Sequence, residues 1–168
     1  MTAAWKDNGI SDEELIKHVT QEEITKITTE ERDQENRKCN IVVYGIPEKK
    51  TEVASERKQN DMIFVKDLFD AVFNMTIEDA DIEKLYRLGR RQEDKPRPLL
   101  IAFHNEKKDY IMANLRNLKY SVDKFKKIGI SHDLPPRERE ENKRMVEEAK
   151  LVHNTQGNDT AENYKFLW

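Results

Sequence analysis

The chain of 168 residues is 36% hydrophobic and 38% charged, with a formal net charge of −3. This length suits one buried domain with extensions. No apolar run approaches the roughly 20 residues of a membrane-spanning helix, and the N-terminus lacks a signal peptide's apolar stretch. The single cysteine, Cys39, excludes an internal disulfide. These features predict an intracellular protein without membrane contact, cytoplasmic or alternatively nuclear.

Charge is unevenly distributed along the chain. Residues 11–35 hold nine acidic and three basic side chains, a local charge of −6. Residues 84–97 carry +4 and residues 107–127 carry +5. A basic body that follows an acidic arm is compatible with nucleic-acid binding, because the distribution of charge matters more than the net charge.

The acidic arm has the pattern of a helix. Residues 1–10 are expected to be disordered. Residues 11–37 are expected to be helical, because Ser11 and Glu14 have capping-box spacing and the segment contains neither Gly nor Pro. The apolar positions are sparse for a core helix: Leu15, Ile16, Val19, Ile24 and Ile27. Two interpretations stay open, a solvated helix and a coiled-coil remnant that forms a homo-oligomer through residues 11–36.

Residues 38–131 alternate between strand and helix patterns. Strands are expected at residues 41–46, 82–88, 99–103 and 128–131, with Ile82, Tyr86 and Leu88 on one face of the second. Helices are expected around Met62–Val72, after the first strand, and at residues 107–118, after the third. The βαββαβ order predicts an α+β fold, with a four-stranded antiparallel sheet, two helices on one face and the other face open.

Residues 132–168 are expected to form a partial C-terminal domain. Asp133 is predicted to cap a helix with Pro135 and Pro136 in its first turn, running to about Val152. Tyr164–Trp168 is expected to begin a strand that is incomplete. The sheet domain is therefore predicted to lie between an N-terminal helix and a C-terminal helical extension.

Catalytic and metal-binding patterns are lacking in the sequence. The four histidines do not have metal-ligand spacing. Ser131, His132 and Asp133 are adjacent and cannot converge as a catalytic triad. No Gly-rich phosphate loop occurs. We therefore expect no enzyme activity, no metal or other cofactor and no small-molecule substrate.

The βαββαβ order resembles the RNA-recognition motif (RRM), in which aromatic side chains on the first and third strands stack on bases. Here Tyr44 lies on the first strand, whereas Val42, Pro98 and Leu100 stand where the motif has aromatic residues. Because stacking contributes about 1–3 kcal/mol per base, this RRM-like surface is expected to bind mainly through phosphates and with little sequence preference.

Four segments carry a more specific resemblance: RKCNIVVYGIPE at residues 37–48, YRLGR at 86–90, KPRPLLI at 95–101 and ISHDLPPRER at 130–139. They resemble the RRM-type domain of the first open reading frame protein of LINE-type non-LTR retrotransposons. The resemblance implies a trimerising coiled coil before the domain, a small C-terminal domain after it, and a basic cleft between the two domains. In the family that cleft packages the element's RNA into a ribonucleoprotein and acts as a nucleic-acid chaperone.

The predicted partner is single-stranded RNA or DNA. The candidate contacts are eleven basic side chains and one aromatic side chain, some of them carried over from the resemblance: Arg37, Lys38, Tyr44, Arg87, Arg90, Arg91, Lys95, Arg97, Lys126, Lys127, Arg137 and Arg139. The alternative function is a protein–protein interaction module on a degenerate RRM-like scaffold.

Overall fold

The structure is a computed structural model that describes residues 11–156. The predictions for residues 1–10 and for Tyr164–Trp168 lie outside the described residues. Contacts divide the chain between Asn36 and Arg37 into two units, which are described separately. None of the helices in the described range is long and apolar enough to cross a membrane.

Helix α1 (Asp12–Arg37) begins as the sequence predicts. The Glu14 amide donates to Ser11 Oγ and the Ser11 amide donates to Glu14 Oε2, both at 3.2 Å, which is a capping box. The helix has no buried residue, and its apolar side chains Leu15, Ile16, Val19, Ile24 and Ile27 are all exposed. Within its own unit, α1 therefore has no core to pack against.

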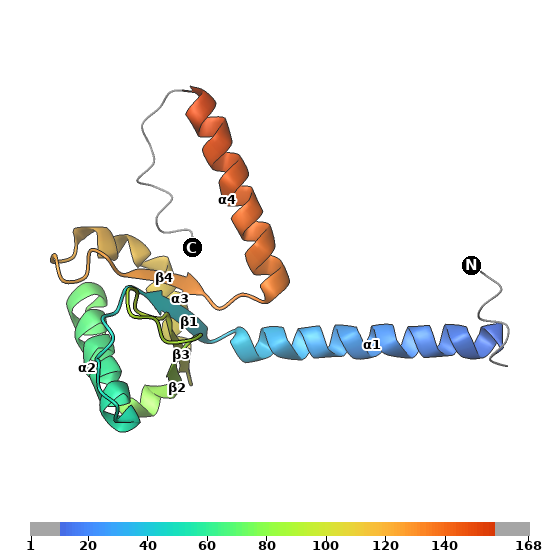
Figure 1. Cartoon of the computed structure of the whole chain (residues 1–168), viewed down its shortest axis with the longest axis horizontal. Helices are drawn as coiled ribbons and strands as arrows, with labels where there is room; N and C mark the ends of the chain where they lie inside the picture. The colour runs from blue at the N-terminus through green and yellow to red at the C-terminus, as the bar shows by residue number, and fades with distance from the viewer. Residues whose placement is uncertain (1–10, 157–168) are drawn as a thin grey trace. The chain divides into compact units, whose positions relative to one another are not determined.

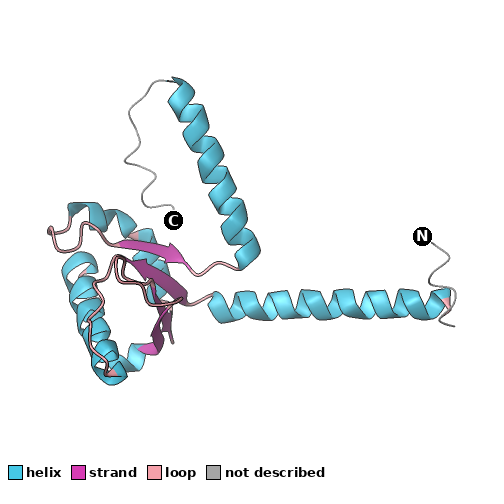
Figure 2. Ribbon diagram, in the orientation of Figure 1, coloured by secondary structure: helices cyan, strands magenta, loops and turns pink. Residues whose placement is uncertain are grey.

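Four strands form one antiparallel sheet in the order β2-β3-β1-β4 (Figures 1 and 2). They are β1 (Asn40–Tyr44), β2 (Ile82–Arg87), β3 (Leu99–Phe103) and β4 (Gly129–His132). Helix α2 (Ala54–Phe73) and the short turn η2 (Asp79–Asp81) join β1 to β2, while α3 (Lys107–Ala113) and η3 (Leu115–Tyr120) join β3 to β4. Helix α4 (Pro136–Gln156) follows β4. The α+β class and the four-stranded antiparallel sheet are confirmed.

The core lies on one face of the sheet. Alternate residues of the central strands point into it, including Ile41 and Val43 on β1 and Ile101 on β3. Helix α2 contributes Phe69 and its neighbours at helical spacing, and α3 contributes Ile111. Both connecting helices therefore pack against the same sheet face.

The opposite face of the sheet is less open than expected. Tyr86, Leu100, Val42 and Ser131 form one row across it, because each is paired with the next in register. Val42 and Leu100 are nevertheless only 3% exposed, and Val146 of α4 is also buried. Helix α4 lines the same cavity as Val42, so it covers part of the face that the sequence predicts to be open.

Strand β2 departs from the predicted alternation. Its pairing with β3 shifts register between Ile82 and Lys84. Such an irregularity changes the side that the residues before it face. Ile82 consequently packs against the core, instead of sharing a face with Tyr86.

The end of β1 lies very close to the segment before β4. Gly45 has φ +84°, and a Cβ at this position would lie 2.5 Å from the carbonyl oxygen of Lys127. Only glycine fits this conformation and this contact without displacement. The close approach places the backbone of Lys127 at the end of the sheet beside Tyr44, which pairs with Gly129.

Candidate functional site

Arg87 is a structural residue in the folded domain. Its side chain is 6% exposed and lies between β2, α2 and the loop after β1. Nε donates to Asp61 Oδ2 at 3.0 Å and Nη2 to Asp61 Oδ1 at 2.5 Å, while the remaining N–H groups donate to the carbonyl oxygens of Ile46, Pro47 and Arg97. All five N–H groups of the guanidinium are therefore engaged. This arrangement argues against the predicted phosphate contact at Arg87.

Arg97 is also engaged within the fold. Its Nε and Nη2 both contact the carboxylate of Glu48, and Nη1 donates to the carbonyl oxygen of Gly89 at 3.2 Å. The Glu48 side chain is 10% exposed. The hydrogen bond from Arg97 lowers the pKa of Glu48 below its usual 4.5, against an opposing effect of burial. The pair joins the loop after β1 to the loop before β3.

This lowered pKa predicts an acid-sensitive contribution to stability. Because the folded-state pKa lies below 4.5, the contribution is present above the unfolded-state pKa and is lost as the pH falls through the folded-state pKa. Glu48→Gln should therefore show a flatter decline in the free energy of unfolding below about pH 4.5. Urea denaturation at several pH values between 3 and 7 would measure the difference. Parallel curves for the two proteins would contradict the prediction.

Arg37 takes part in a buried polar cluster, which we call the Asp133 hub. Asp133 accepts from Arg37 Nη1 at 2.7 Å and from Asn40 Nδ2 at 3.0 Å, and its side chain is 3% exposed. The backbone bond that starts α4 runs from the Arg139 amide to the carbonyl oxygen of Pro135. Asp133 stands before this first turn and is not the predicted helix cap. Its carboxylate instead fixes the segment from which α4 departs.

A buried lysine lies near this hub. Lys108 is buried, and its Nζ donates to the carbonyl oxygen of Lys38 at 2.8 Å. Burial lowers the pKa of Lys108 by disfavouring its charged form. Lys38 itself, a predicted contact, is exposed.

The loop between β2 and β3, which we call the basic loop, carries exposed cations. Arg90, Arg91 and Lys95 are all exposed. In the part of the chain that the structure describes, none of the three has a hydrogen-bond or ion-pair partner. They differ in this respect from Arg87 and Arg97 at the two ends of the same loop.

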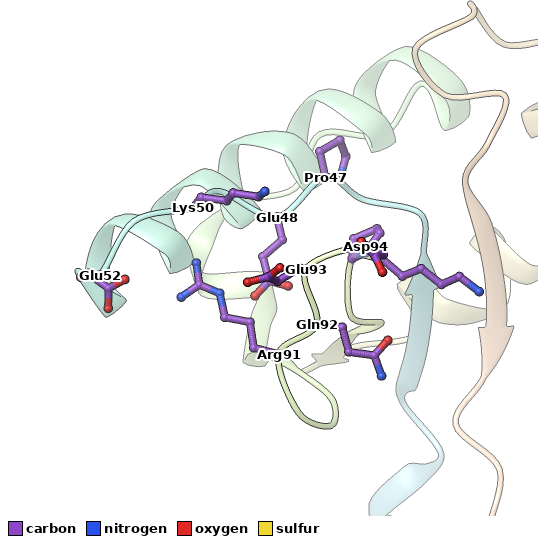
Figure 3. Close-up of a pocket in the computed structure, with 10 residues that line it drawn as sticks. Pro47, Glu48, Lys50, Glu52, Arg91, Gln92, Glu93 and Asp94 are labelled. Carbon is purple, nitrogen blue, oxygen red and sulfur yellow. The ribbon is translucent and has the colours of Figure 1, made fainter.

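A polar cavity of about 690 Å³ separates the basic loop from the loop after β1. Figure 3 shows the Arg91 side chain extending toward the loop that carries Lys50 and Glu52. Glu48, Glu93 and Asp94 also line this cavity. The mixture of acidic and basic side chains makes it a poor site for a polyanion, so the candidate site lies elsewhere.

A second cavity, which we call the groove, lies between the sheet and α4 and has a volume of about 380 Å³. Its sheet side is mainly apolar and is formed by Val42, Tyr44, Leu88 and Pro98. The wall that α4 contributes consists of Arg139, Asn142, Lys143 and Val146. Leu88 and Gly89 line the groove directly before Arg90, so the basic loop begins at its edge.

Only some of the predicted contacts lie at or near this groove. Tyr44 and Arg139 line it, Arg90 follows Gly89 at its edge, Arg91 lines the polar cavity instead, and Arg137 is exposed on the first turn of α4. Lys126 is exposed and pairs with Asp123 at 2.6 Å, and Lys127 is exposed beside Gly45. Arg37, Arg87 and Arg97 are instead held within the fold.

Of the α4 wall of the groove, sequence reasoning identified only Arg139 and missed the other three residues. Arg139, Asn142, Lys143 and Val146 recur at i, i+3, i+4 and i+7, which places them on one face of the helix. This spacing is visible in the sequence. However, a single valine among charged residues does not indicate that the helix returns to the sheet.

No catalytic constellation is formed by the residues near the start of α4. Ser131 Oγ donates to the backbone carbonyl of His132 at 3.3 Å, and the Asp133 carboxylate is bound by Arg37 and Asn40. Between residues 11 and 156, no three His, Cys, Asp or Glu side chains form a group that could hold a metal ion.

Comparison with known proteins found no family model that matches the chain and no curated protein that matches it significantly.

Proposed function

We propose that this protein is a non-enzymatic, RRM-like module that binds single-stranded nucleic acid, most readily RNA, with low sequence specificity. The observation that carries the proposal is the apolar groove on the sheet, next to cations that have no partner among the described residues. Arg90 directly follows Leu88 and Gly89 at the edge of the groove, Arg91 is the next residue of the basic loop and lines the neighbouring polar cavity, and Lys143 lies in the α4 wall. An anionic partner with flat apolar groups fits both features.

The binding mechanism is phosphate capture with release of counterions. Each phosphate neutralised on a single strand contributes about −0.7 to the slope of log affinity against log salt concentration. The guanidinium groups of the basic loop are suited to this contact because they can engage phosphate oxygens with two parallel hydrogen bonds. Since phosphates carry no sequence information, preference for particular sequences should be slight.

The biological setting that we propose is a retrotransposon ribonucleoprotein. The four sequence segments that resemble the LINE-type family support it, as do the βαββαβ element order and the strand order β2-β3-β1-β4. The apolar residues of α1 are exposed. We propose that this helix associates with the same helix in further copies of the chain.

The Arg90→Ala/Arg91→Ala double variant tests this function. Loss of two phosphate contacts should make the salt slope less negative by about 1.4 and weaken binding about 25-fold at 0.1 M salt. Fluorescence anisotropy of a labelled single-stranded RNA 30-mer, titrated at several salt concentrations, measures both quantities.

A matched control removes the same charge elsewhere. Arg116 and Lys119 are exposed on the helical side of the sheet, and neither has a partner within residues 11–156. Arg116→Ala/Lys119→Ala should change the affinity much less than the basic-loop variant does. Equal losses in both variants would indicate a general charge effect, and no binding by the unaltered chain would favour a protein-interaction module.

A further inference from the structure

The groove differs from the remaining exposed surface of the sheet in having two walls. Tyr44 and Tyr86 are both on the face opposite the core, at 39% and 49% exposure. Only Tyr44 lines the groove, where α4 stands across from the sheet. A planar group placed on Tyr44 would thus contact α4 as well, whereas one placed on Tyr86 would lie outside the groove.

The chemistry of the groove changes from its floor to its rim. The floor is apolar, with Val42, Leu88 and Pro98 beside the Tyr44 ring. The rim is cationic: Lys143 has no partner in the described chain, and Arg139 is 62% exposed. Arg139 Nη2 donates to the carbonyl oxygen of Leu134 at 3.1 Å and lies 4.0 Å from Asp133 Oδ1. Nε and Nη1 of Arg139 have no partner among the described residues and can meet an anion.

The α4 wall also carries a neutral polar group. The amide of Asn142 lines the groove and has no hydrogen-bond partner among the described residues. An amide can both donate and accept, which suits the varied edges of different nucleobases. A purely apolar ligand would leave this amide unused.

From these features we propose that the groove is a base-binding slot that holds one unpaired nucleobase, with its phosphate on Arg139 and Lys143. This proposal rests on the proposed function and specifies which part of the nucleic acid is recognised, namely one base with its phosphate. The volume of about 380 Å³ lies at the lower end of the range for small-ligand sites, which suits a single base with its sugar. A paired base would first have to leave its stack, at a cost of a few kcal/mol. The slot therefore selects single strands without reading a sequence.

The experiment compares two labelled probes of equal charge, an oligonucleotide 12-mer and a sugar–phosphate 12-mer that lacks bases. The unaltered chain should bind the ordinary probe about 5- to 150-fold more tightly than the baseless probe, as expected for one stacked base. Tyr44→Ala should remove most of this difference and leave binding of the baseless probe unchanged. Tyr86→Ala is the matched control and should keep the difference.

A second variant covers the case in which Tyr44→Ala disturbs the fold. Asn142 is exposed on α4, so Asn142→Trp should fill the groove without loss of a core contact and should also remove the preference for bases. If the unaltered chain binds both probes equally, the slot is refuted while the proposed function stands. If it binds neither probe, the proposed function fails as well. Equal weakening of both probes by Tyr44→Ala and Asn142→Trp would also overturn the slot.

Discussion

Arg87→Met is expected to lower the free energy of unfolding by about 3–5 kcal/mol, the usual range when one partner of a buried ion pair is removed. The substitution would leave the Asp61 carboxylate, whose side chain is 8% exposed, without its guanidinium. It would also leave three carbonyl oxygens, on Ile46, Pro47 and Arg97, without a donor. Urea denaturation followed by near-ultraviolet circular dichroism would measure the loss.

Two further variants make this prediction specific. Arg90→Met, on an exposed residue three positions further along the chain, should change stability by less than about 0.5 kcal/mol. The double variant Arg87→Met/Asp61→Leu should be less destabilised than Arg87→Met alone, because no unpaired buried charge remains. If Arg87→Met instead left stability unchanged and weakened nucleic-acid binding, Arg87 would be a phosphate contact after all.

Asp133→Ala is the second change for which we expect a large effect. It removes two charge-assisted hydrogen bonds, from Arg37 and Asn40, and each is worth about 1.5 kcal/mol when the group is buried. It also removes the 4.0 Å ion pair with Arg139, which contributes little because the Arg139 side chain is 62% exposed. Since Arg37 is 27% exposed and regains water, we expect a total loss of about 2–3 kcal/mol. The Asp133 hub also fixes the start of α4, so binding of single-stranded RNA should weaken although Asp133 touches no ligand.

The salt dependence separates this positioning role from a direct contact. Asp133→Ala can displace Arg139 and Lys143 together, and should then reduce the magnitude of the salt slope by the contribution of about one phosphate, the one that we place on these two residues. Asp133→Asn retains an acceptor for Asn40 and should lie between the unaltered chain and Asp133→Ala in both stability and affinity. A loss of stability with unchanged affinity and slope would show that α4 keeps its place without the hub.

The strands and helices could be predicted because their causes are local. Short continuous runs of apolar residues define β1 and β3, and the helical spacing of Val65, Phe69 and Val72 defines the inner face of α2. The capping box at Ser11 and Glu14 likewise depends on residues three positions apart. These features do not require knowledge of distant contacts.

The roles of individual arginines could not be read in the same way. Arg87 and Arg90 belong to the same cationic run. Arg87, however, forms a buried ion pair with Asp61, which lies 26 positions earlier in the chain. One signal was present: Arg87 shares the alternation of Leu85, whose side chain is in the core. The position of an arginine within a strand was therefore better evidence for its role than its membership of a cationic run.

The position of α4 depended on contacts that sequence pattern does not show. Its only buried apolar side chain is Val146 among the residues whose burial is described, and the rest of the helix surface is largely charged. The hub that anchors it joins Asp133 to residues more than 90 positions earlier. Long-range polar contacts of this kind determine where α4 lies and therefore form the groove. No periodicity in the sequence indicates them.

The lack of buried residues in α1 bears on every stability measurement proposed above. A helix without packing melts gradually, because its hydrogen bonds are supported only by neighbouring turns, while the sheet unit can unfold in one cooperative transition. Far-ultraviolet ellipticity would add these two processes together and broaden the apparent transition. The free energies of the variants should therefore be taken from a signal that arises in the core, such as that of Phe69 and Phe103, whose rings lie 6.1 Å apart.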